Sequence, residues 1–375
     1  MAGGKRLADN DVPVPLWVRA IGGHVSRHPG FWRRLANLET RVLADELAEV
    51  AIDRPVYVCG LARSGTTILL ETLSRHSRTA SHCYGDYPFT FTPFWWNWLL
   101  ARMPQEKTAP QERIHKDGIL VTAESPEALE ESLWMAFFPH LHDPHADNRL
   151  TEDTENPVFE RFYRAHIRKL LLARGRSRYL AKGNYNLTRI PWLLKLFPDA
   201  RFVVPVRDPV WHIASLMKQH RLFCDAERKT PALLDHMRRV GHFEFGLDWR
   251  PVNPGDTAGM QRVLDLWNSG QEVRGWAAYW ALIHRYVAAV AEVIPAVHLV
   301  RYEDLCTRPN ECVAAMLKHC GLEAETAVMD FAGTLHAPGY YRPEFSATDL
   351  AVIAEETEEI AGRLGVAVEA VAAVD

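Results

Sequence analysis

Several signatures of common protein classes are missing from this sequence of 375 residues. Its six cysteines include no Cys-x-x-Cys pair and no dense cluster, so we expect reduced thiols rather than a disulfide framework. No run approaches the roughly 18 apolar residues of a transmembrane helix, and residues 1–17 lack the continuous apolar core of a signal peptide. A formal net charge of −4 argues against a general nucleic-acid binder. We therefore expect a soluble, cytoplasmic protein.

What the chain does contain is an alternation of predicted strands and helices. An α/β fold follows from it, with a P-loop-like parallel sheet, helices on both faces and helical insertions. A helix is also expected from 126 to 138, because Pro126 suits a first helical turn, whereas the pattern over 221–268 is irregular. The strands are expected at 55–59, 179–184, 201–206 and 296–301, and the other helices at 35–50, 68–76, 157–173, 190–197, 210–221 and 272–293.

Neither an internal repeat nor a low-complexity linker interrupts the sequence. Hydrophobic residues make up 47% of it, which is ample for a buried core. We expect a single domain over residues 1–375, with a helical N-terminal segment over 1–54 and an insertion over 221–271.

The loop Gly60-Leu61-Ala62-Arg63-Ser64-Gly65-Thr66-Thr67 carries the strongest chemical signal. It fits the phosphate-binding template G-x-x-x-x-G-K-[ST] at both glycines and at the final hydroxyl, but Thr66 stands where the lysine should be. A strand before it and a helix after it place several backbone N–H groups around one anion. The loop therefore predicts a phosphate site without the cation that reaches the β- and γ-phosphates of a triphosphate.

A nucleotide with a single 5′-phosphate would need this cradle and neither the lysine nor Mg²⁺. Arg63, inside the loop, supplies a planar cation suited to bidentate contact with an oxyanion. The structural alternative is a glycine turn that merely packs a helix against a strand.

A second segment points to a second phosphate. The apolar strand over 201–206 runs into Arg207-Asp208-Pro209, and Ser215 follows eight residues after Arg207, about two turns into a predicted helix. An arginine at a strand end and a helical hydroxyl can grip one phosphate together. The alternative for Arg207 is an ion pair with Asp208 or a surface position.

These segments resemble those of the sulfotransferases that use 3′-phosphoadenosine 5′-phosphosulfate (PAPS). The loop is similar to their 5′-phosphosulfate loop, and Val206-Arg207-Asp208-Pro209 with Ser215 is similar to their 3′-phosphate site. Two further segments, Tyr179 to Asn184 and Leu299 to Leu305, look like the family's lysine-bearing strand and the late strand that closes the nucleotide site. An arginine in the loop, rather than a lysine, resembles the tyrosylprotein and bacterial branches of the family more than the cytosolic small-molecule branch.

The resemblance implies transfer of a sulfuryl group from PAPS to an acceptor hydroxyl, with no metal. It assigns the nucleotide to Arg63, Ser64, Gly65, Thr66, Thr67, Arg207, Ser215 and Tyr302. It places Lys182 beside the leaving oxygen, where the alternative is a surface lysine at a strand end. The insertion over 221–271 is expected on the acceptor side.

The general base is less defined by the sequence. The glutamate of the protein-tyrosine branch corresponds by position to Tyr84 here, so Asp86 is the nearest acid. On the following segment Glu127, Glu130 and Glu131 compete with it, and Glu131 is the second choice. Each of these acids could instead be a solvated helix residue.

Two further segments bear on the acceptor. The run His140-Leu141-His142-Asp143-Pro144-His145 could hold a divalent ion, although an acceptor-facing loop is favoured. The aromatic stretch over 89–100 is either core packing or a surface for a sugar or lipid, so a carbohydrate or glycolipid acceptor is expected. Two rivals stay open: a catalytically silent relative that binds the nucleotide, and a P-loop kinase, which the missing lysine disfavours.

Overall fold

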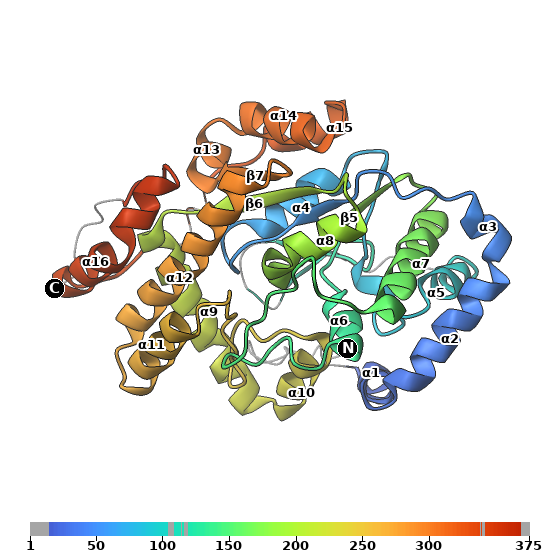
Figure 1. Ribbon diagram of the computed structural model, residues 1–375, viewed down its shortest axis with the longest axis horizontal. Helices are drawn as coiled ribbons and strands as arrows, with labels where there is room; N and C mark the ends of the chain where they lie inside the picture. The colour runs from blue at the N-terminus through green and yellow to red at the C-terminus, as the bar shows by residue number, and fades with distance from the viewer. Residues whose placement is uncertain are drawn as a thin grey trace, which may run out of the picture.

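A five-stranded sheet forms the centre of the computed structural model, which describes residues 15–103, 109–113, 115, 119–337, 339 and 342–368. Its strand order is β2-β5-β1-β6-β7, and every neighbouring pair is parallel (Figure 1). The strands are β1 (Val56–Val58), β2 (Thr79–Ala80), β5 (Arg178–Lys182), β6 (Arg201–Val206) and β7 (Val297–Arg301). A separate antiparallel pair is formed by β3 (Gln111–Glu112) and β4 (Leu120–Val121).

Helices cover both faces of this sheet, as the sequence predicts. Successive side chains of a strand point to opposite faces, so Val56 and Val58 pack on one side and Tyr57 on the other. The first face is covered by α4 (Thr66–Ser74), α14 (Pro309–Cys320) and α15 (Thr326–Ala332). The second is covered by α7 (Pro157–Arg174), α8 (Ile190–Leu196) and α12 (Glu272–Val293). The predicted α/β fold is confirmed.

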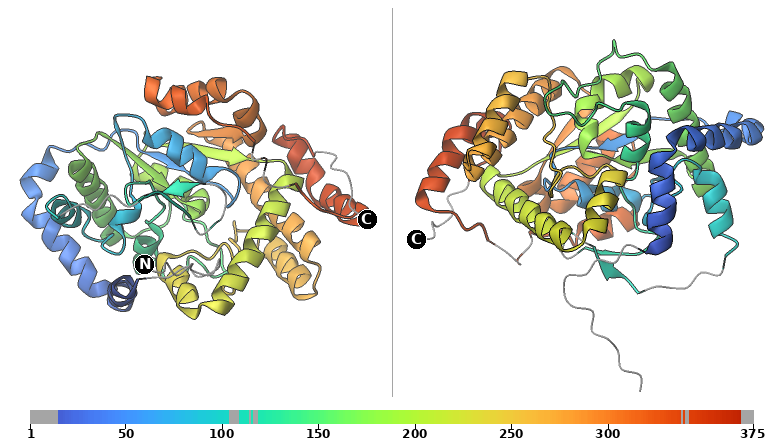
Figure 2. Two further views of the ribbon diagram at one scale, coloured as in Figure 1. Left: turned by 180° about the vertical axis from the view of Figure 1, so that it is seen from behind. Right: turned by 90° about the horizontal axis from the view of Figure 1, so that it is seen from below.

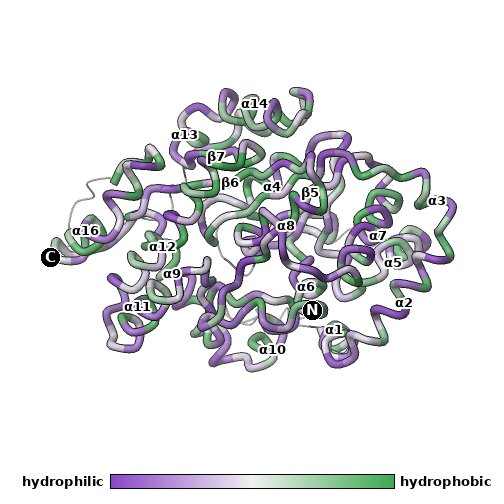
Figure 3. The backbone as a smooth tube through the Cα atoms, viewed as in Figure 1, coloured by the Kyte–Doolittle hydropathy of each residue, from purple (hydrophilic) through white to green (hydrophobic). Residues whose placement is uncertain are grey.

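The remaining helices surround this core (Figures 1 and 2). Their outer turns alternate between hydrophobic and hydrophilic residues, as α2 does in Figure 3. Among the described residues, no helix has the length and the apolar content needed to cross a membrane. The helices are α1 (Leu16–Arg27), α2 (Pro29–Val42), α3 (Ala44–Ala48), α5 (Pro93–Leu100), α6 (Glu131–Phe137), α9 (Pro209–Lys229), α10 (Pro231–Val240), α11 (Thr257–Asn268), α13 (Tyr302–Thr307) and α16 (Ala347–Arg363), with the 3₁₀ helices η1 (Tyr84–Asp86) and η2 (Asn184–Arg189).

Two sequence-based expectations about helices are wrong. The helix expected from 126 begins at Glu131, because Pro126 is held in an antiparallel bridge with Cys83. The segment over 221–268 is not irregular, since it contains the end of α9 and the helices α10 and α11.

Strand register gathers the predicted site at one edge of the sheet. Val58 is paired with Lys182 on one side and with Val203 on the other. Val206 is paired with Arg301. The residues that follow β1, β6 and β7, and the last residue of β5, therefore meet where the parallel strands end.

Candidate active site

The phosphate loop has the backbone that its glycines predict. Gly65 precedes α4 with φ of 112°, a conformation that a side chain rarely allows. A Cβ atom there would lie 2.8 Å from Cδ2 of Tyr302, so a glycine is needed for space as well. Arg63 also adopts the left-handed region, with φ of 71°.

The residues predicted for the nucleotide lie together. The Nε–H of Arg63 donates to Oγ of Ser215 over 3.2 Å, and Nη1 of Arg207 donates to the Arg63 carbonyl over 3.3 Å. The Arg207 guanidinium lies 4.6 Å from the centre of the Tyr302 ring, in a cation–π contact. Asp208 caps α9, its carboxylate accepting from the Trp211 N–H at 3.0 Å. Both predicted phosphate contacts thus share one corner of the sheet.

A buried histidine supports the loop from behind. Nε2 of His212 lies 2.8 Å from the Ala62 carbonyl, and the Trp280 indole N–H donates to Nδ1 of His212 over 3.1 Å. The two contacts require the neutral ring with its proton on Nε2. Burial first, and then the neighbouring His284, hold the pKa of His212 well below its usual value. Through these two hydrogen bonds, the His212 ring connects the loop to α9 and α12.

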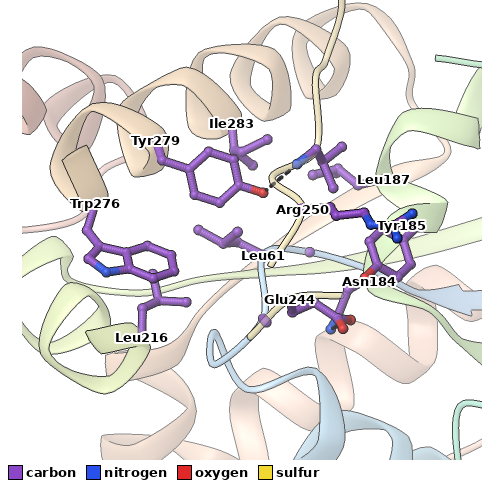
Figure 4. A pocket seen from close by; sticks show the side chains of 13 residues that line it. Leu61, Asn184, Tyr185, Leu187, Leu216, Glu244, Arg250, Trp276, Tyr279 and Ile283 are labelled. Carbon is purple, nitrogen blue, oxygen red and sulfur yellow. Dashed lines mark hydrogen bonds between the residues drawn. The ribbon is translucent and has the colours of Figure 1, made fainter. Parts of the chain in front are cut away.

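The space behind the loop is too small for a ligand. Leu61 of the loop faces Trp276 and Tyr279 of α12 across a cavity of about 20 Å³, room for one water molecule (Figure 4). The Tyr279 hydroxyl accepts a hydrogen bond from the Val252 N–H at 2.9 Å and closes this side. This side of the loop is therefore filled by protein side chains.

Lys182 and Glu127 interact electrostatically beside the phosphate loop. Burial lowers the pKa of the half-buried Lys182, and the charge of Glu127 partly offsets this effect. Burial also raises the pKa of Glu127, but Lys182 and a hydrogen bond from Tyr84 outweigh it, so that pKa is lowered overall. Glu127 is thus an ionised carboxylate at neutral pH.

Two hydroxyls of the loop are held by this same region. Oγ1 of Thr66 donates to Oδ1 of Asn184 over 3.2 Å, and Nη1 of Arg113 donates to Oγ1 of Thr67 over 3.3 Å. Arg113 also interacts with Glu127, whose pKa it helps to lower. Interactions through Arg113 and Glu127 thus connect the phosphate loop to Lys182.

A cavity of about 1240 Å³ opens over these groups. Among its polar and charged lining residues are Arg63, Thr66, Arg113, Glu127 and Lys182. Its apolar lining residues come from α1, α5 and α10 and from nearby loops: Trp17, Val18, Trp96, Leu100, Met103, Leu233, Met237, Val240 and Phe245. The cavity therefore brings residues of the phosphate loop and many apolar side chains to one space.

A model described as the sulfotransferase family matches residues 55–242, which include the loop, Lys182 and Arg207. The chain belongs to this family. It is 22% identical over 311 residues to omega-hydroxy-beta-dihydromenaquinone-9 sulfotransferase Stf3 of Mycobacterium tuberculosis, spanning 78% of this chain and 68% of that protein.

Solved structures of other sulfotransferases are also similar. STF1 of Mycobacterium tuberculosis H37Rv matches with a TM-score of 0.47 and 19% identity, covering 92% of this chain and 86% of that one. STF9 of Mycobacterium avium matches with a TM-score of 0.48 and 13% identity, covering 88% and 82%.

Asp86 of this sulfotransferase is committed to ion pairing. It is 1% exposed, and Nη2 of Arg174 lies 2.8 Å and 2.9 Å from its two oxygens. Nδ1 of His82 and Nδ2 of Asn97 lie 2.8 Å and 3.0 Å from it. Burial raises its pKa, but His82 and Arg174 outweigh burial and lower it to about 2. These contacts join η1, α5 and α7 and argue against the expected role of Asp86 as base, which stays a prediction.

Glu131 is held in the same manner. Arg189 donates to its two oxygens over 2.6 Å and 2.9 Å, and Nε2 of His142 lies 2.7 Å from it. Burial raises its pKa, whereas Arg189 and His142 together lower it to about 2. Glu130 is buried and accepts from the Tyr179 hydroxyl. The same kind of ion pairing argues against Glu131, the second choice for the base, whose role stays a prediction.

His142, in the histidine-rich segment over 140–145, therefore has Glu131 as its partner. Within the described residues, no group of three or more His, Cys, Asp or Glu side chains is arranged to hold a metal ion.

The aromatic stretch over 89–100 takes part in packing and also lines the large cavity, whereas its role as an acceptor surface stays a prediction. Trp96 stacks on Phe89 with ring centres 4.2 Å apart, and its indole N–H donates to the Gly85 carbonyl over 2.6 Å. The same Trp96 lines the large cavity. Packing and ligand contact are therefore not exclusive for this segment.

Sequence reasoning missed Arg113 and His212. Arg113 follows a strand of two residues, and His212 lies inside a helix, so neither belongs to a pattern that marks a site. Only the tertiary contacts with Thr67 and Ala62 identify them.

Proposed function

We propose that this sulfotransferase transfers the sulfuryl group of PAPS to the hydroxyl of an amphiphilic acceptor, a hydroxylated lipid or a glycolipid. The observation that carries the proposal is that one large cavity is lined by Arg63 and Thr66 of the phosphate loop, by many apolar side chains, and by the interacting pair of Lys182 and Glu127. In this arrangement the donor binds at the phosphate loop and the acceptor along the apolar wall of the cavity. The two meet at the acid Lys182 and the base Glu127.

The donor site fits a nucleotide with two separate phosphate groups. Oγ of the fully buried Ser64 and Nε of the buried Arg207 have no hydrogen-bond partner among the described residues. Buried polar atoms rarely stay unpaired, so both are suited to a bound oxyanion. Arg63, Gly65, Thr66 and Thr67 would complete the contact with the 5′-phosphosulfate, and Ser215 and Tyr302 the 3′-phosphate side.

The acid–base roles follow from charge and position. Glu127 accepts the proton of the acceptor hydroxyl, whose oxygen forms the new bond to sulfur. The bond from sulfur to the bridging phosphate oxygen breaks, and Lys182 stabilises the charge on that oxygen or protonates it as the bisphosphate leaves. Arg113, which donates a hydrogen bond to Thr67, is a cation suited to contact the oxygens of the sulfuryl group in transfer.

The apolar lining residues of the cavity support an amphiphilic acceptor. They include Trp96, Leu233, Met237 and Phe245, which suit an alkyl or isoprenoid chain better than a free sugar. Stf3, by its printed name, acts on a hydroxylated dihydromenaquinone. Residues of α10 and the following loop belong to the predicted insertion over 221–271, which supports its acceptor-side role.

The N-terminal helical segment lines the same cavity through Trp17 and Val18. This supports the prediction of a single domain over 1–375. The cytoplasmic location stays a prediction.

Calorimetry and a transfer assay test the proposal. We expect 3′-phosphoadenosine 5′-phosphate to bind tightly and Mg-ATP not to bind, and radiolabelled PAPS to sulfate an ω-hydroxylated prenyl alcohol in detergent. Binding without any transfer would favour the silent relative, and binding of Mg-ATP alone would return the loop to the kinases.

A further inference from the structure

Exposed apolar side chains occur on α1, α2 and α5. These three helices lie on the same flank of the molecule (Figures 1 and 2). On α2, Phe31, Leu38 and Val42 are seven and four residues apart, so they form one stripe along the helix. Large apolar side chains normally lie inside, and such a gathering marks an interaction surface. The exposed set on these helices and the turn after α5 is Leu16, Trp17, Phe31, Leu38, Val42, Trp98, Leu99 and Met103.

The same surface is basic. Over residues 16–42 and 93–103 the only acid is Glu39, which is fully buried and lies 2.8 Å from Nζ of Lys169. The Arg102 guanidinium lies 3.9 Å from the ring centre of the half-exposed Trp98. The arginines of the surface are Arg19, Arg27, Arg34, Arg41 and Arg102, in a chain whose formal net charge is −4.

The large cavity adjoins this surface. Trp17 and Val18 at the start of α1 and Leu100 and Met103 at the end of α5 line the cavity. Trp17 and Met103 are also among the exposed side chains, at 51% and 49%. The apolar surface is therefore continuous with the apolar wall of the site.

We propose that the surface of α1, α2 and α5 binds the face of an anionic lipid bilayer, from which the acceptor enters the cavity. Tryptophan, with an apolar body and a polar N–H, and arginine, with an apolar stem, both suit the bilayer interface. Arginines near anionic headgroups add about fivefold each to membrane binding. Entry of the acceptor from the bilayer rests on the proposed function, because it requires an amphiphilic acceptor. Binding of the surface to the bilayer does not depend on that function.

A second copy of the chain is a poorer occupant. In a symmetric dimer the same patch meets itself, so arginines would face arginines. Anionic headgroups instead complement both the charge and the apolar stripe.

Sedimentation with vesicles tests the proposal. The full-length protein is mixed with vesicles of phosphatidylcholine alone or with phosphatidylglycerol added. We expect binding to the anionic vesicles, weakened about tenfold or more in Phe31→Ser/Leu38→Ser and in Trp98→Ser/Leu99→Ser. Arg34→Glu/Arg41→Glu should weaken it similarly. The matched control Leu247→Ser/Val293→Ser removes apolar side chains that are also exposed, at 45% and 75%, but lie outside this surface.

None of these substituted side chains lines the cavity, so nucleotide binding and turnover of detergent-dispersed acceptor should be unchanged. Absence of vesicle binding, or equal loss in the control, would overturn the proposal even if transfer in detergent succeeds. A concentration-dependent dimer abolished by Trp98→Ser/Leu99→Ser, without vesicle binding, would identify a second copy as the occupant. Vesicle binding without any transfer would instead leave the surface standing and contradict the proposed function.

Discussion

At the scale of single residues, the acids of the candidate site differ in their partners, since an arginine donates to both oxygens of Asp86 and of Glu131. Glu127 lies beside Lys182 and accepts from Tyr84, whereas Asp86 and Glu131 are saturated by arginine and histidine. A carboxylate held by two hydrogen bonds from a guanidinium cannot readily turn to a substrate hydroxyl. The role of each of these acids therefore depends on the residues that it contacts and not on its being an aspartate or a glutamate.

Replacing Glu127 with glutamine removes the proposed base while keeping its shape. We expect Glu127→Gln to lower kcat by about 10²-fold or more, with bisphosphate affinity unchanged. Single-turnover transfer from labelled PAPS and calorimetry measure the two quantities. Asp86→Asn should lower thermal stability instead, because Arg174 would lose its partner. If Asp86→Asn abolished transfer at full stability and Glu127→Gln did not, the assignment would be reversed.

Arg207 provides the second residue-scale prediction. It is 6% exposed, it packs on Tyr302, and its Nε has no partner within the described part of the chain. We expect Arg207→Ala to weaken bisphosphate binding about 10- to 100-fold, since a charge-assisted contact to the 3′-phosphate is lost. Adenosine 5′-phosphate, which lacks that phosphate, should bind the variant and the parent equally. Equal loss for both ligands would place Arg207 elsewhere.

At the scale of elements, the junction of β1 and α4 depends on one glycine. Gly65→Ala places a methyl group 2.8 Å from the Tyr302 ring at a φ of 112°, so the loop or α13 has to move. We expect at least a tenfold loss of bisphosphate affinity, because the cradle is displaced. Gly175→Ala is the matched control: its φ is 61° and nothing lies within 4 Å, so it should cost about 1 kcal/mol of stability and no affinity. Unchanged binding in Gly65→Ala would show that the loop adapts.

Elements with strong local signals could be predicted from the sequence. The strand Arg201–Val206 has its predicted bounds, and the phosphate loop lies between a strand and a helix as its glycines require. Elements decided by distant contacts could not be predicted. Pro126 favours a helix start, but pairing with Cys83 takes it into a bridge. The interactions that neutralise Asp86 and Glu131 join residues 88 and 58 positions apart, which no local pattern records.

For the molecule as a whole, buried charges and buried neutral histidines make stability depend on pH in two windows. His284 stays neutral because burial lowers its pKa to about 4, below the usual 6.5. A group with a depressed folded pKa stabilises the protein above its unfolded pKa and loses that contribution as pH falls. Stability should therefore begin to fall below pH 6.5, and it should fall again below about 4.5 as the carboxylates become protonated.

The second window can be isolated with one substitution. Glu131 has a pKa of about 2 against an ordinary 4.5, so its ionised form contributes about 3 kcal/mol above pH 4.5. We expect Glu131→Gln to be less stable than the parent at pH 7, because Arg189 is left unpaired, and the difference to shrink steadily between pH 4.5 and 2. Urea unfolding followed by tryptophan fluorescence measures both curves. A constant difference across that range would mean that Glu131 is not ionised in the folded protein, and its ion pair with Arg189 would have to be abandoned. Convergence would instead confirm that the acid expected to serve as base holds the fold together, leaving the proton transfer to Glu127.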